Sequence, residues 1–181
     1  MTTNKHTLLV AGTFSLAAML ICSLVFSQSN TKLTDPEIAS IAVVANQIDI
    51  SYAELAKGKS KDAEVLKFAE TMATDHKSVI DQAVALVTKL GVTPKDNDVS
   101  KQLQADAEKT RKSLASTSGA AFDKAYIDNE VAYPKGVISV LESRLIPESE
   151  NRELKDLLTN VMPAFKTHLS HAEMVQKKFA K

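Results

Sequence analysis

Apolar residues recur at steps of three and four along most of the chain after residue 35, and this rhythm constrains the fold more than any other feature. Side chains at that spacing share one face of an α-helix, so each run predicts a helix with one buried face. Four long runs show the pattern: Ile38, Ile41, Ala45, Ile48, Tyr52 and Leu55; Val65, Phe68, Met72, Val79, Ala83, Leu86 and Leu90; Phe122, Tyr126, Tyr133, Val137, Leu141 and Leu145; and Leu154, Leu158, Val161, Phe165, Ala172, Val175 and Phe179.

Capping and breaking residues separate these runs. Asp35, before a proline, is expected to be the N-cap of the first helix, which ends near Gly58. Ser60 is expected to cap the second helix, and Gly91 to end it. A weaker stripe predicts a short helix around residues 100–116, followed by a break at 118–119 and another at 147–151.

The composition favours an all-α protein. The 181 residues include only 5 Gly and 5 Pro, fewer turn residues than a many-stranded β fold needs, and 44% are hydrophobic. Four amphipathic helices predict a four-helix bundle over residues 36–180, with the segment 92–119 as a long helical crossover between its second and third helices. That arrangement is ferritin-like. A simple up-and-down bundle with a decorated loop is the alternative.

The N-terminus carries an export signal or an anchor. Residues 7–26 are uncharged and follow a short start in which Lys5 is the only fixed positive charge, as in the first part of a secretory signal peptide. In one interpretation, residues 1–27 are removed by a cut after Ser27. In another, the apolar stretch stays as a membrane anchor, since about 20 apolar residues span a bilayer. Lipid modification of Cys22 is a third interpretation, which the bulk of Ile21 disfavours.

The charge and cysteine content exclude several functions. The 22 basic residues balance the 22 acidic ones, so a nucleic-acid partner is not expected. Cys22 is the only cysteine, and a chain that loses residues 1–27 has neither a disulfide nor a reactive thiol. Neither a Gly-x-Ser-x-Gly nucleophile motif nor a glycine-rich phosphate loop is present in the sequence, which weakens hydrolase and nucleotide-binding hypotheses.

Polar residues occupy positions where the core is expected. His76, Glu130 and His168 lie on the stripes of three different helices. Inward-facing histidines and carboxylates build the metal sites of helical bundles. His171, one turn after His168, is a further candidate ligand, and the first helix offers Glu54 or Asp49. These residues predict a site for iron, zinc, copper or manganese.

A purely structural role is the alternative for the same residues. A core histidine is commonly bonded to a neighbouring carboxylate, and Glu130 is then the expected partner of His76. Asp75 is expected at the helix edge. The Glu-x-x-His pairs of di-iron bundles are absent, because Ala73 and Phe165 stand three residues before the two histidines. Two prolines inside helical runs, Pro134 and Pro163, predict kinks near these polar residues.

Four segments together resemble the domain of unknown function 4142 family of exported bacterial proteins, across roughly residues 36–180. They are KFAETMATDHKSVI, GAAFDKAYIDNEVAY, LIPESENRELKDLL and MPAFKTHLSHAEMVQ. The resemblance implies a ferritin-like bundle and an exported location, but no reaction. It also implies a histidine at the position of Pro134, so a metal site of His76, Glu130 and His168 would here be incomplete or altered.

The sequence therefore predicts an exported, all-α bundle in the periplasm or cell envelope. The first functional hypothesis is a non-enzymatic protein that acts by binding or in stress tolerance, with its core polar residues bonded to one another. The second is a metal-binding bundle with a redox role. The third is a spacer tethered to the membrane through residues 7–26. The sequence does not identify a protein partner.

Overall fold

A computed structural model of the 181-residue chain describes residues 31–179. Over this range the protein is all-α, as the composition and the apolar rhythm predicted. The helices are α1 (Asp35–Lys59), α2 (Ala63–Leu90), α3 (Asp98–Ala115), α4 (Gly119–Val140), the π-helix η1 (Leu141–Leu145), the short α5 (Ile146–Glu148), α6 (Arg152–Gln176) and the 3₁₀ turn η2 (Lys177–Phe179).

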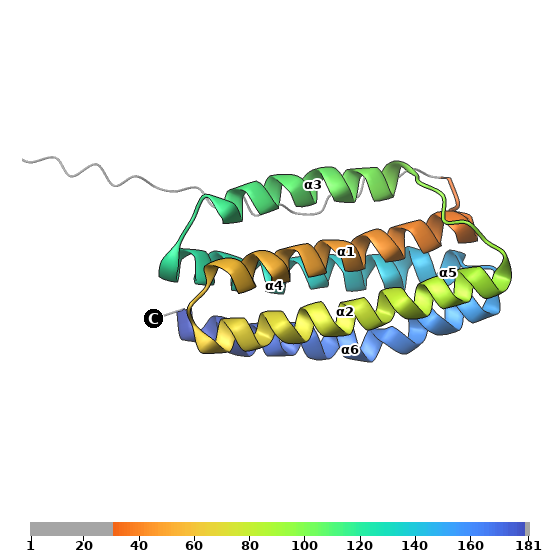
Figure 1. Cartoon of the computed structure of the whole chain (residues 1–181). Coiled ribbons are helices and arrows are strands. Elements are labelled where there is room, and N and C mark those ends of the chain that lie inside the picture. The colour runs from red at the N-terminus through yellow and green to blue at the C-terminus, as the bar shows by residue number, and fades with distance from the viewer. Residues whose placement is uncertain (1–30, 180–181) are drawn as a thin grey trace, which may run out of the picture.

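The long helices lie alongside one another as a bundle (Figure 1). The closest packing joins α1 to α2 and α4 to α6, and α2 also packs against α6. Since α1 and α2 are joined by a short link, they run in opposite directions, and so do α4 and α6 (Figure 1). Their inner faces form one core in which Ile38, Phe68, Phe122 and Ile127 are fully buried.

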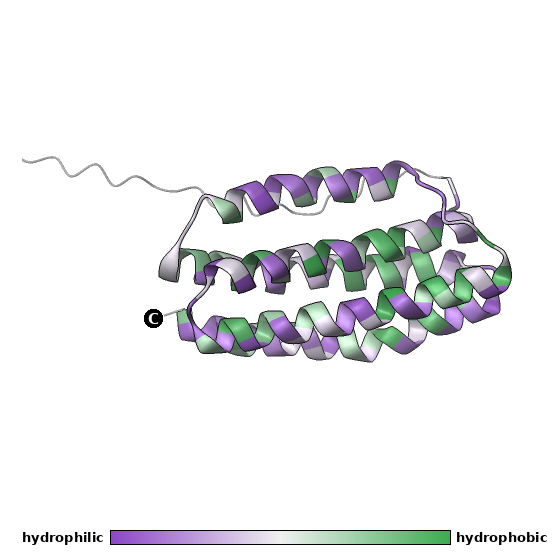
Figure 2. Cartoon of the chain, in the orientation of Figure 1, coloured by the Kyte–Doolittle hydropathy of each residue, from purple (hydrophilic) through white to green (hydrophobic). Residues whose placement is uncertain are grey.

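Helix α3 carries the chain back along the outside of the bundle. It returns from the far end of α2 to the start of α4, so α2 and α4 point the same way (Figure 1). It packs mainly against α1 and is predominantly hydrophilic, apart from a narrow buried stripe (Figure 2). That stripe is Val99, Leu103, Ala107 and Leu114. The predicted crossover segment is thus a helix with one buried edge.

Two helix caps differ from those predicted. Thr34, not Asp35, is the N-cap of α1, and the Glu37 carboxylate accepts bonds from its backbone N–H and hydroxyl at 3.0 and 2.8 Å. The Asp35 carboxylate instead accepts the backbone N–H groups of residues 150 and 151, which ties the start of α1 to the start of α6. Asp62, not Ser60, caps α2, while Gly91 ends it with the predicted left-handed conformation.

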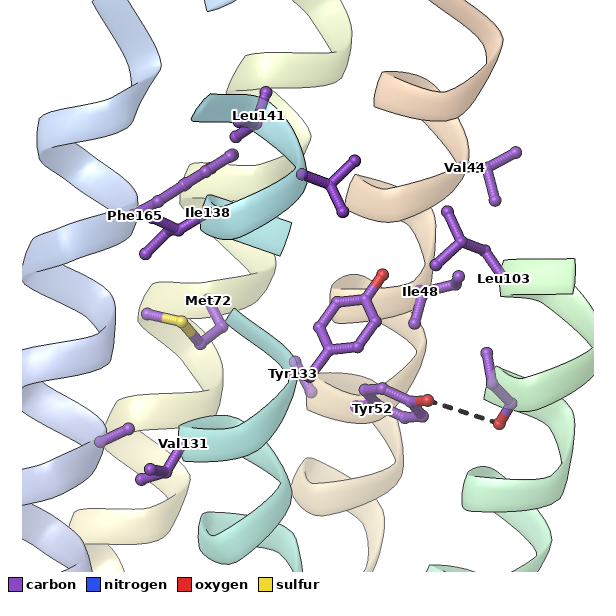
Figure 3. Close-up of a cluster of buried hydrophobic side chains, with 14 of the residues drawn as sticks. Val44, Ile48, Tyr52, Met72, Leu103, Val131, Tyr133, Ile138, Leu141 and Phe165 are labelled. Carbon is purple, nitrogen blue, oxygen red and sulfur yellow. Dashed lines mark hydrogen bonds between the residues drawn. The ribbon is translucent and has the colours of Figure 1, made fainter. Parts of the chain in front are cut away.

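Aromatic side chains fill the space between α1 and α4 (Figure 3). The rings of Tyr52 and Tyr133 meet edge to face, 5.7 Å between centroids. The Tyr133 hydroxyl donates to the carbonyl of Ala45 at 3.2 Å, and the Tyr52 hydroxyl reaches the carbonyl of Ala107 on α3 at 3.5 Å. Tyr52 therefore links the crossover helix to the core.

Pro134 lies inside α4 and Pro163 inside α6, as expected, and the kinks that they predict stay predictions. The predicted signal or anchor, residues 1–27, lies outside the described residues. Within residues 31–179, none of the helices has the length and apolar content that crossing a bilayer requires.

Candidate functional site

Four of the long helices each place an ionisable side chain in the interior. Asp49 comes from α1, His76 from α2, Glu130 from α4 and His168 from α6, and their exposed fractions are only 1–6%. All four therefore lie in the core among apolar neighbours. Burying ionisable groups is unfavourable unless they are neutral, paired or bound to a ligand.

The ring of His76 is held on two sides. Its Nδ1 lies 2.7 Å from Oδ1 of Asn46, whose Nδ2 donates to the Ala42 carbonyl at 2.8 Å. Because the Asn46 amide is oriented by that second bond, its oxygen accepts and His76 Nδ1 carries the hydrogen. The ring also stacks on Phe165, with centroids 5.3 Å apart. In a neutral His76 the lone pair therefore lies on Nε2, which takes no part in the hydrogen bond to Asn46.

His168 is held in the same manner from the other side of the site. Its Nε2 donates to Oδ2 of Asp75 at 2.9 Å, and Asp75 is half exposed at the helix edge, as predicted. The other ring nitrogen, Nδ1, is buried and has no hydrogen-bond partner among residues 31–179. The His76 and His168 rings lie 5.3 Å apart between centroids. The predicted meeting of these two histidines is therefore present.

A small cavity lies between the two histidines. It measures about 10 Å³ and is lined by Asp49, His76, Pro134, Val137, Phe165 and His168. That volume holds about one water-sized species. Asp49 Oδ2 lies 3.6 Å from His76 Nε2, which is too far for a hydrogen bond.

The protonation of the site follows from burial. Burial and the charge of nearby His168 lower the pKa of His76 to about 3, so this ring is neutral near pH 7. Burial raises the pKa of Asp49 well above its usual range. Burial and, to a smaller extent, the charge of Asp49 also raise the pKa of Glu130 well above its usual range. A weaker interaction with the Asn129 side chain lowers that pKa. Both shifts favour the neutral, protonated form of these two carboxyl groups.

Several of these polar atoms are not satisfied by the protein. Among the described residues, neither carboxylate oxygen of Glu130 has a hydrogen-bond partner, and the same holds for Oδ1 of Asp49 and the hydroxyl of Tyr126. The expectation that Glu130 is the partner of His76 is wrong, since Asn46 takes that place. The charge of Asp49 instead raises the pKa of Glu130, and the charge of Glu130 raises the pKa of Tyr126.

Two of the predicted ligands lie elsewhere. The Glu54 side chain is 56% exposed and pairs with Lys57, because it points away from the stripe of α1. The His171 ring packs on Phe68, at 5.1 Å between centroids, and does not line the cavity. Within residues 31–179, no three His, Cys, Asp or Glu side chains are arranged to hold a metal ion as they stand.

The di-iron centre of ferritin-like proteins does not fit this interior. It needs a Glu-x-x-His pair on each of two helices. The position three before His76 is Ala73, which packs against the apolar core. The position three before His168 is Phe165, whose ring stacks on His76. Phe165 therefore takes the place where a second carboxylate would be needed.

Two residues of the site are not predicted by the sequence pattern. Asp75 is expected only at the helix edge and Asn46 is not a candidate, whereas Asp49 is already the alternative to Glu54 on the first helix. Asn46 lies three residues before Asp49, so both belong to one face of α1, next to the apolar stripe. This spacing of two polar residues is the sequence pattern from which a polar site on α1 could have been predicted.

Comparison with known proteins gives one result. Neither a curated protein nor a solved structure matches the chain significantly. The sequence profile of one family, described as a domain of unknown function (DUF4142), matches residues 24–175. This match spans most of the sequence and contains all four buried ionisable residues of the site. The chain therefore belongs to the DUF4142 family.

Proposed function

We propose that this protein is an exported, ferritin-like four-helix bundle of the cell envelope that acts by binding a small ligand at its polar centre, without catalysis. The four bundle helices are α1, α2, α4 and α6, with α3 as the crossover. The parallel course of α2 and α4 supports this assignment, because one long crossover between two helical hairpins is the ferritin-like connection.

The size of the central cavity is the observation that carries the proposal. A cavity of about 10 Å³ admits one water-sized species. An organic substrate needs a site of several hundred Å³. The polar cavity therefore suits a small ion or molecule, held among buried polar groups.

The unsatisfied polar atoms favour binding over a purely structural role. Each buried donor or acceptor without a partner costs about 1–3 kcal/mol of stability. Of the described residues that line the cavity, Asp49 and His168 contribute such atoms. A bound species that satisfies some of them offsets this cost.

Export is proposed from the sequence of the N-terminal segment. Residues 7–26 are uncharged and apolar, which supports a cleaved signal or a retained anchor. If the segment is retained, the bundle is tethered to the membrane. N-terminal sequencing of the protein from fractionated cells tests this. A start near residue 28 in the periplasm indicates cleavage, and an intact N-terminus in the membrane fraction indicates a tether. Recovery from the cytoplasm would contradict export.

Native mass spectrometry of the protein isolated from the envelope tests the binding function. We expect a mass above that of the polypeptide by one small species, lost in Asp49→Asn and kept in Glu54→Gln, whose residue lies at the surface of the same helix. If the isolated protein carries no adduct, and no small ion raises its melting temperature, the proposal is wrong.

A further inference from the structure

We propose that the ligand is a divalent transition-metal ion of the zinc class, held by Nε2 of His76, Nδ1 of His168 and the carboxylate of Asp49. The inference rests on the proposed binding function and names its ligand. It keeps two of the residues predicted from the sequence, replaces Glu54 by Asp49, and leaves His171 and Glu130 outside the ligand set.

The hydrogen bonds of the two histidines assign the metal-binding nitrogens. His76 Nδ1 is hydrogen-bonded to Asn46, and His168 Nε2 is hydrogen-bonded to Asp75. In protein metal sites, a ligating histidine donates its other ring N–H to a carboxylate, amide or carbonyl, which fixes its tautomer and orientation. Both histidines already have this outer partner.

The spacings of His76 to Asp49 and of His76 to His168 are close to those around one tetrahedral ion. With metal–nitrogen and metal–oxygen bonds of about 2.0–2.1 Å, two ligand atoms of a tetrahedron lie about 3.4 Å apart, and two imidazole centroids about 5 Å apart. His76 Nε2 lies 3.6 Å from Asp49 Oδ2, and the centroids of the two histidines are 5.3 Å apart. Both distances slightly exceed the ideal, so the ion must draw the three side chains inward.

The chemistry of the ligands selects the class of ion. Two imidazole nitrogens and one carboxylate suit zinc and neighbouring transition metals, whereas calcium and magnesium prefer oxygen alone. All three side chains line the same cavity, which has room for about one ion. Since Asp75 is half exposed, the His168 end of the site lies just below the surface, where an ion enters by the shortest route.

Cobalt(II) is the probe for the test, because its visible absorption reports tetrahedral coordination and zinc then displaces it. The full-length chain, purified in detergent and stripped with chelator, is titrated with Co²⁺ and then with Zn²⁺. The test variants are His76→Gln, His168→Gln and Asp49→Asn. His171→Gln is the matched control, because it removes a histidine from the same helix as His168 but away from the cavity.

We expect one Co²⁺ per chain with tetrahedral absorption in the wild type and in the His171 variant. The affinity falls at least about 100-fold in each ligand variant, and about 10–100-fold in Asn46→Ala, which removes an outer partner. Circular dichroism checks folding. If one histidine variant unfolds, the Asp49 and Asn46 variants still test the site.

The inference is overturned if the wild type binds neither ion, or if folded His76 and His168 variants bind as tightly as the wild type. If Co²⁺ and Zn²⁺ do not bind while the protein isolated from the envelope carries another small species, the metal assignment alone fails. If that protein carries nothing and no ion stabilises it, the binding function fails as well.

Discussion

His76 Nδ1 lies 2.7 Å from Oδ1 of Asn46, and this contact decides which nitrogen of the buried ring carries the hydrogen. The Asn46 amide is itself fixed by its bond to the Ala42 carbonyl, so its oxygen has to accept. One residue of α1 thereby sets the tautomer of a histidine on α2. The lone pair of His76 then lies on Nε2, the nitrogen next to Asp49.

Asn46→Ala is expected to destabilise the fold by about 1–3 kcal/mol, because it leaves a buried imidazole N–H without its acceptor. Urea unfolding followed by circular dichroism measures the change. Gln47→Ala, at the exposed neighbouring position of α1, is the control and should alter stability by less than about 0.5 kcal/mol. Equal stability of the two variants would show that the Asn46–His76 bond contributes nothing.

Acid is expected to destabilise the protein through His76. Its pKa is about 3 in the folded state and near 6.5 when unfolded, so between these values the unfolded chain binds the extra proton. Stability is therefore lost as the pH falls below 6.5, by about 2 kcal/mol at pH 5.

The contribution of His76 is isolated by comparing the wild type with His76→Gln at pH 7 and pH 5. The drop in the free energy of unfolding should be about 2 kcal/mol smaller in the variant, which lacks the titrating ring. Equal drops in the two proteins would mean that His76 is not held neutral by burial.

Glu130→Gln is expected to reduce the loss of stability at alkaline pH. The pKa of Glu130 is raised in the folded state, so above the unfolded value near 4.5 the folded chain binds more protons, and its stability falls as the pH rises. The decrease in unfolding free energy from pH 5 to pH 8 should be smaller in the variant than in the wild type. Glu142→Gln, which removes an exposed carboxylate paired with Lys166, should follow the wild type.

Pro134→His is expected to strengthen the proposed metal site. Pro134 lines the central cavity, so an imidazole there adds a fourth protein ligand, and the new N–H restores a donor to the Glu130 carbonyl one turn earlier. We expect Co²⁺ to bind at least about tenfold more tightly. Pro163→His, at an exposed position inside α6, is the matched control and should leave the affinity unchanged. Equal affinities of the two variants would exclude residue 134 from the site.

The sequence predicted the helices well, because their causes are local. The apolar period of α1, α2, α4 and α6 and the conformation required at Gly91 depend on near neighbours in the chain. The caps at Thr34 and Asp62 were missed because several polar residues compete at each helix start. The Asp35 carboxylate accepts hydrogen bonds from backbone N–H groups at the start of α6. No local sequence pattern reveals this contact, because α6 is distant in the chain.

The sequence by itself determined that His76, Glu130 and His168 face inward, since a position on an apolar stripe fixes the buried side of a helix. Only the tertiary structure decided which residues meet. Periodicity gives neither the axial level of a residue nor the rotation of its helix against a neighbour. Packing brought His76 to Asn46 and Asp49 and His168 to Asp75, while it left Glu54 at the surface and His171 against Phe68.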